Sequence, residues 1–145
     1  VTDLETQVQQ TIAAGARALI GGTRLPGPGN YFAPTVLVDI PPGSPAYRDE
    51  LFGPVASVFR VRSVDEAIRL ANDSSFGLGA SVWTTDRARG EAVARRLQAG
   101  ATFVNAIVRS DVRLPFGGTK TSGFGRELAE HGIHEFMNIK TIYVD

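Results

Sequence analysis

The sequence predicts an α/β fold with a largely parallel sheet and flanking helices. Segments with strand character alternate with helical segments through the middle of the chain, and the connections between them are short. Ser63-Val64-Asp65-Glu66 is a capping box, which marks the start of a helix between two such strands. The almost continuously apolar run over 78–83 is typical of a strand covered on both faces, as in a parallel sheet.

Composition limits the classes of function that the chain can have. Its 145 residues are the size of one domain, and the 43% that are hydrophobic are enough for a packed core. Basic and acidic residues number 15 each. We therefore expect neither nucleic acid nor a membrane as the main partner, because both attract a basic excess. No signal peptide is visible, and we expect a cytoplasmic protein.

Cysteine is absent from the chain. This excludes a disulfide, a thiolate metal site and a cysteine nucleophile within the chain, and we expect no metal site. The sequence opens with Val1-Thr2-Asp3, without an initiating Met and already inside a helical pattern. We therefore expect it to be a piece of a longer protein.

The first elements are predicted from periodicity and breakers. Apolar residues recur every fourth position and predict a helix that ends at Gly15: Leu4, Val8 and Ile12. A short apolar run over 16–20 predicts a strand. The segment 31–40 is rich in β-branched and aromatic residues, but Pro34 cannot donate to a ladder. We therefore predict at best an edge strand or an irregular extended piece there.

The middle of the chain follows the strand and helix alternation. The predicted elements are, in order, a strand over 55–61, a helix over 63–71, a strand over 78–83, a helix capped by Asp86 and a strand over 101–105. Gly100 lies where the glycine that follows a helix C-terminus is expected.

The alternation stops over 106–125, which shows neither helical nor strand period and contains four glycines near its end. A loop this long in a compact domain is functional or disordered, and its apolar side chains argue against disorder. Helical periodicity returns over 126–137. The terminal run over 139–144 predicts a strand that needs a partner edge, which another subunit could supply.

Glu50-Leu51-Phe52-Gly53-Pro54-Val55 lies at the mouth of a predicted strand. Pro54 fixes its own φ and moves Gly53 away from the helical region, so the side chains before it are held at a defined angle. The carboxylate of Glu50 and the ring of Phe52 could there grip a ligand that is part polyol and part flat ring. The alternative is a solvated loop charge beside a core phenylalanine.

Four motifs together resemble aldehyde dehydrogenases, in the order and at about the spacing found in that family. They are Glu-Leu-Phe-Gly-Pro-Val at 50–55, Asn72-Asp73 followed by Phe76-Gly77-Leu78, Asn105, and Pro-Phe-Gly-Gly-Thr-Lys-Thr-Ser-Gly-Phe-Gly-Arg-Glu at 115–127. The resemblance covers the whole chain but only the C-terminal part of the family's length. Arg109-Ser110-Asp111, Gly123 to Leu128 and His134-Glu135-Phe136 look most like the bacterial succinate-semialdehyde dehydrogenase branch.

The resemblance implies a fold and an assembly. It implies that residues 1–138 are the C-terminal portion of the family's catalytic α/β domain, and that residues 139–145 are a strand added to an oligomerisation sheet. The implied assembly is a homo-oligomer joined through that strand.

The resemblance also implies site residues. Glu50 matches the acidic residue that bonds the nicotinamide ribose hydroxyls of NAD or NADP, and Phe52 matches the aromatic residue near the nicotinamide. Phe116 matches the aromatic residue that lines the aldehyde tunnel, and Ser110 the serine that binds the distal carboxylate of succinate semialdehyde. Arg109 could assist Ser110 by its charge, and the alternative for Ser110 is a plain turn serine.

The family's nucleophilic cysteine has no counterpart here, and neither does its general base. The resemblance therefore implies an enzyme that oxidises a small aldehyde to its acid, of which this chain alone is inactive, without a catalytic residue of its own. Two other hypotheses remain open: a standalone, non-catalytic module for assembly or binding, and an α/β domain in which the segment 115–127, which we call the glycine loop, cradles a phosphate. The loop lacks the spacing of a Walker loop, and no helix follows Lys120 as in such a loop.

Overall fold

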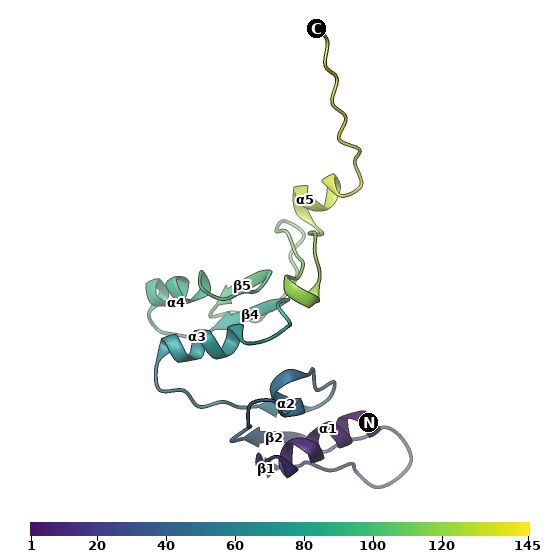
Figure 1. Cartoon of the computed structure of the whole chain (residues 1–145), viewed down its shortest axis with the longest axis vertical. Coiled ribbons are helices and arrows are strands. Elements are labelled where there is room, and N and C mark those ends of the chain that lie inside the picture. Colours follow the sequence, from purple (N-terminus) through teal and green to yellow (C-terminus); the bar gives the residue numbers. More distant parts are fainter. The chain divides into compact units, whose positions relative to one another are not determined.

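The structure is a computed structural model that describes all residues, 1–145. It divides into two compact units, Val1–Arg62 and Ser63–Asp145, which we call the first and the second unit. Figure 1 shows the elements of each unit. None of the helices combines the length and the apolar character needed to cross a membrane.

The first unit is a three-stranded sheet with two helices. Its elements are α1 (Thr2–Ala13), β1 (Arg17–Ile20), β2 (Thr35–Val38), α2 (Pro45–Arg48) and β3 (Val55–Ser57). β1 pairs antiparallel with β2, and β2 pairs parallel with β3. The buried core joins α1, β2 and α2 through Leu4, Val8, Leu37 and Ala46 among others. The predicted first helix and first strand are confirmed.

β2 corrects one prediction, because it is the central strand of this sheet and not an edge strand. Pro34 lies just before the strand, so its missing N–H removes no ladder bond. The strand can therefore pair on both sides. β3 is shorter than the predicted 55–61, because its partner β2 ends at Val38 and the last bond runs from the Val58 N–H to the Leu37 carbonyl.

The second unit begins with two helices, each of which is followed by a strand. Its elements are α3 (Val64–Asn72), β4 (Gly79–Val82), α4 (Arg87–Ala94), β5 (Ala101–Val104), the 3₁₀ turn η1 (Lys120–Ser122) and α5 (Ala129–His134). β4 and β5 pair in parallel, with Gly79 opposite Ala101. Both predicted caps are confirmed: the Glu66 N–H donates to the Ser63 hydroxyl at 3.1 Å, and the Arg89 N–H to the Asp86 carboxylate at 3.0 Å.

The prediction that 78–83 is covered on both faces is wrong for this chain. Leu78 is 45% exposed and Trp83 65% exposed. A sheet of two strands with α4 packed against it is too small to have both faces covered. The apolar run is nevertheless a parallel strand, as its composition predicts.

The C-terminal part of the second unit has little regular structure. Residues 106–119 contain no helix or strand, in agreement with the predicted loop. α5 is shorter than the predicted 126–137, because Glu127 pairs with Phe116 and the next two residues have positive φ angles of 64° and 49°. The segment 139–144 forms no strand within the chain and its large apolar side chains are exposed, so the oligomerisation strand stays a prediction.

Gly100 corrects another prediction. α4 ends at Ala94 with Arg95 as its C-cap, so Gly100 does not end a helix. It lies instead against the backbone of Gly117, at a position where a Cβ atom would overlap the Gly117 carbonyl. Its N–H donates to the Gly77 carbonyl at 3.0 Å. The glycine therefore permits the glycine loop to approach the start of β5.

Candidate functional site

Glu50 and Phe52 lie on the segment of the first unit that connects α2 to β3. Leu51 between them is partly buried and packs against the core, whereas Glu50 and Phe52 are exposed. Phe52 is 87% exposed, so it does not belong to the core of this unit. The segment is held by its backbone, since the Gly53 N–H donates to the Leu51 carbonyl at 2.9 Å and the Val55 N–H to the Gly53 carbonyl at 2.8 Å.

The Glu50 carboxylate makes no hydrogen bond or ion pair in the structure, whereas the Glu50 backbone carbonyl accepts from the Gln7 amide at 3.4 Å. A free carboxylate has two oxygens that can accept from two adjacent hydroxyls of a polyol. An exposed ring next to it can lie against a flat ring of the same ligand. Glu50 thus offers a hydrogen-bond acceptor, and Phe52 offers an apolar surface close to it.

The second unit contains a cleft of about 400 Å³ between the glycine loop and α5. Phe116 is half-buried in its wall, and the N–H and carbonyl of Phe116 both bond to Glu127 at 2.8 Å. Arg126 closes the loop from within, because its guanidinium donates to the Gly118 carbonyl at 2.8 Å and to the Gly125 carbonyl at 2.6 Å. The position of the Phe116 ring is therefore set by a loop that is closed on itself.

The glycine loop is a poor phosphate cradle. The Lys120 ammonium already donates to two backbone carbonyls of the same unit, at 2.8 Å each. The amides of Thr119 and Thr121 are likewise bonded to backbone carbonyls. Only the three-residue turn η1 follows the loop's glycine pair, so no helix N-terminus faces a ligand there. These contacts argue against the phosphate hypothesis.

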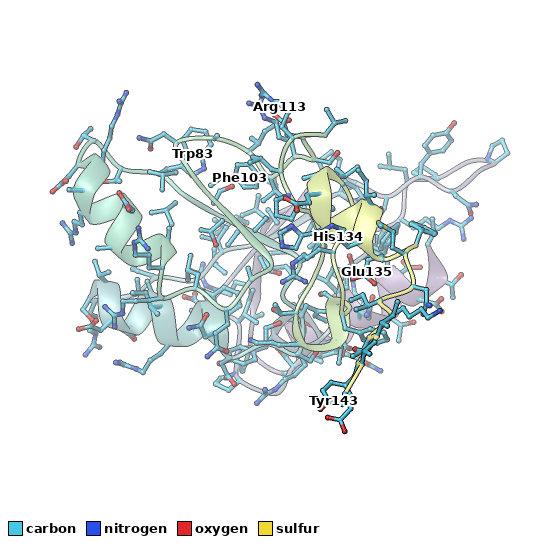
Figure 2. All side chains as sticks on the ribbon, turned by 90° about the horizontal axis from the view of Figure 1, so that it is seen from above. Trp83, Phe103, Arg113, His134, Glu135 and Tyr143 are labelled. Atoms are coloured by element: carbon cyan, nitrogen blue, oxygen red, sulfur yellow. The ribbon has the colours of Figure 1, made fainter.

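Ser110 is exposed on the irregular stretch that precedes Phe116 in the second unit. Nearby, the Arg113 guanidinium donates to both Asp111 oxygens, at 2.9 and 2.7 Å. These bonds, together with the Arg113 backbone N–H, hold the pKa of the Asp111 carboxyl well below its usual range. Arg113 projects outward from the loop with its charge neutralised (Figure 2), whereas Arg109 makes no ion pair.

The Asp111–Arg113 pair was not predicted, although the Asp-x-Arg spacing in a loop is a signal for such a fork. Among the predicted site residues, the structure presents Glu50 and Phe52 together on the first unit. It places Ser110 and Phe116 on one continuous stretch of the second unit.

Comparison with known proteins adds to these observations. The model of the aldehyde dehydrogenase family matches residues 1–142. A probable NADP(+)-dependent succinate-semialdehyde dehydrogenase of Synechocystis sp. is 54% identical over 144 residues, which are 99% of this chain and 32% of that protein. The Escherichia coli succinate semialdehyde dehydrogenase [NAD(P)+] Sad is 48% identical over 143 residues, 99% of this chain and 31% of that protein.

A solved structure is also similar. The succinic semialdehyde dehydrogenase of Streptococcus pyogenes, in complex with NADP+ as the cofactor, superposes with a TM-score of 0.92 at 38% identity. The match covers 99% of this chain and 31% of that one. The chain thus spans about a third of the length of the relatives it matches.

Proposed function

This chain belongs to the aldehyde dehydrogenase family, and we propose that it forms part of an NAD(P)+-dependent enzyme that oxidises succinate semialdehyde to its carboxylic acid. The relatives support this proposal, because two similar proteins are named as succinate-semialdehyde dehydrogenases. The chain spans about a third of their length, so it supplies only part of the site.

The observation that carries the proposal is the exposed pair Glu50 and Phe52 on a segment held by backbone hydrogen bonds. The residues fit the cofactor, because an unpartnered carboxylate suits the ribose hydroxyls next to the nicotinamide and Phe52 offers an apolar surface to its ring. NAD(P)+ supplies the hydride acceptor when it is bound. Glu50 and Phe52 then orient the ring and restrict its rotation, which favours transfer in one geometry.

The second unit supplies substrate contacts in this proposal. Phe116 lines the path of the aldehyde and excludes water from it, while Ser110 donates its hydroxyl hydrogen to the distal carboxylate of the substrate. Arg109 adds a positive charge and, unlike Arg113, forms no ion pair with a carboxylate of the chain. A chain without cysteine contains no thiolate to attack the aldehyde, so the nucleophile is contributed from outside these residues.

We also propose that the segment 139–145 is an oligomerisation strand that pairs with a second copy, and its exposed Ile139, Ile142 and Val144 support this. The division into a portion 1–138 and a strand 139–145, and a cytoplasmic location, stay predictions.

Replacing Ser110 by Ala in the complete enzyme tests the substrate assignment. A hydrogen bond to a charged group is worth about 1.5–3 kcal/mol, so we expect kcat/KM for succinate semialdehyde to fall by about tenfold or more. The value for an uncharged aldehyde of similar length should stay within about twofold, because that substrate has no carboxylate to bind. Steady-state kinetics with both substrates measure the difference.

The matched control is Ser110→Thr, which retains the hydroxyl and should restore the preference for the charged substrate. Equal losses for the two aldehydes would show that Ser110 has a structural role only.

A further inference from the structure

Residues 119–122 dock along residues 72–77, and we call this contact the 119–122 clamp. The Thr119 N–H donates to the Gly77 carbonyl at 2.9 Å, and the Thr121 N–H to the Ser75 carbonyl at 3.0 Å. The Gly77 N–H in turn donates to the Ser122 hydroxyl at 2.9 Å. The glycine loop is therefore fixed to the connection between α3 and β4 by bonds that alternate along both segments.

Lys120 makes the charged part of the clamp. Its ammonium donates to the carbonyls of Asn72 and Ser74, at 2.8 Å each. Asn72 is the last residue of α3, so the ammonium satisfies a carbonyl that has no partner within the helix and meets the negative end of the helix dipole. The backbone of Lys120 has a φ of 55°, a conformation that is unfavourable for a residue with a side chain. The two bonds of the ammonium offset that strain.

The clamp lies close to Phe116 along the chain. Only Gly117 and Gly118 separate Phe116 from Thr119, and Gly118 is buried. The Gly117 backbone is packed against Gly100, and the Gly118 carbonyl accepts from Arg126. Because both glycines are fixed by these contacts, they cannot absorb a shift of Lys120, and the shift would move Phe116.

We propose that Lys120 is a positioning residue for the aldehyde path: its ammonium, on the two carbonyls at the end of α3, holds the loop that sets the place of Phe116. This role rests on the proposed function, in which Phe116 contacts the aldehyde. Lys120 itself is too fully engaged with backbone carbonyls to bind the substrate.

Hydrogen exchange in the complete protein tests the clamp without reference to activity. In Lys120→Met, which keeps the length of the side chain and removes its donors, we expect the amides of Phe116 and Glu127 to exchange about tenfold faster or more, because their mutual bonds open more often. Lys120→Arg should restore slow exchange, since a guanidinium can donate to both carbonyls. Arg69→Met removes a positive charge from the last turn of the same helix and should leave both amides unchanged.

Kinetics of the same variants test the positioning role. For Lys120→Met we expect the KM of the aldehyde to rise by about tenfold while kcat changes by less than about threefold, because the loop shapes binding and carries no reacting group. The KM of NAD(P)+ should not change, since the bonds of the 119–122 clamp involve neither Glu50 nor Phe52. A milder variant, Thr121→Val, keeps the backbone bond to Ser75 and should give a smaller effect in the same direction if Lys120→Met fails to fold.

The outcomes separate the two claims. Unchanged exchange at Phe116 and Glu127 in Lys120→Met overturns the clamp. Faster exchange with an unchanged aldehyde KM overturns the positioning role, and so does an equal rise in the KM of aldehyde and cofactor. If the unsubstituted complete protein oxidises no aldehyde, the proposed function fails and the positioning role with it, while the exchange data still decide whether the clamp exists.

Discussion

Glu50→Gln in the complete enzyme is expected to lower kcat by about 10- to 100-fold, because hydrogen bonds to a charged acceptor are worth about 1.5–3 kcal/mol and a glutamine oxygen is neutral. Gln also replaces one acceptor by a donor, so it can no longer accept from both ribose hydroxyls. The nicotinamide would then sample orientations that do not react, which lowers the rate of hydride transfer. Single-turnover kinetics of nicotinamide reduction measure this rate directly.

Stability should be unaffected in Glu50→Gln. The carboxylate is exposed and has no partner within the chain, so its removal breaks no interaction of the fold. Asp49→Asn is the matched control, since it neutralises the adjacent exposed carboxylate and should leave kcat within about twofold. Unchanged hydride transfer in Glu50→Gln would remove Glu50 from the cofactor site.

Gly100→Ala is expected to destabilise the second unit by about 3 kcal/mol, at the upper end of the usual cost of overpacking. The new methyl group would overlap the Gly117 carbonyl, and backbone atoms cannot rotate away as a flexible side chain can. The loop would have to leave the start of β5, and the clamp would loosen with it. Urea unfolding of the chain, followed by tryptophan fluorescence, reports on the surroundings of Trp83, which lies in this unit and is the single tryptophan of the chain (Figure 2).

Gly123→Ala is the control for this variant. Gly123 belongs to the same loop and has open space around the position of a Cβ atom, but its φ of 137° is unfavourable for alanine. Its cost should therefore be about 1–2 kcal/mol and arise from backbone strain alone. If Gly100→Ala destabilises the second unit no more than Gly123→Ala, the close approach of Gly100 and Gly117 is not needed for the fold.

The elements that the sequence predicts well are those fixed by neighbouring residues. Ser63 and Asp86 mark helix starts because each accepts from an N–H three residues ahead, and such spacing is visible in the sequence. The central position of β2 in its sheet cannot be predicted from neighbouring residues, because it depends on which other strands pair with it. Pro34 suggests an edge strand, but it precedes the first paired residue of β2 and therefore removes no ladder bond.

The predicted site likewise combines features that are fixed by neighbouring residues with features that depend on distant parts of the chain. The place of Glu50 and Phe52 beside the Gly53-Pro54 turn could be predicted from neighbouring residues alone. The Lys120 contacts could not, because the carbonyls it binds are 48 and 46 residues away in the chain. Backbone carbonyls carry no sequence signal, and neither does the close approach at Gly100. Contacts to distant backbone therefore appear only in the structure.

The measurement that tests the central claim most directly is aldehyde-dependent reduction of NAD+ and NADP+, assayed for this chain alone and for the complete product of its gene. Succinate semialdehyde is the substrate, and mass spectrometry verifies that each sample is pure. We expect no turnover by the chain alone, because it contains no cysteine nucleophile, and turnover by the complete product. Turnover by the pure chain would contradict the account, and so would a complete product that reduces neither cofactor, which would favour a non-catalytic module.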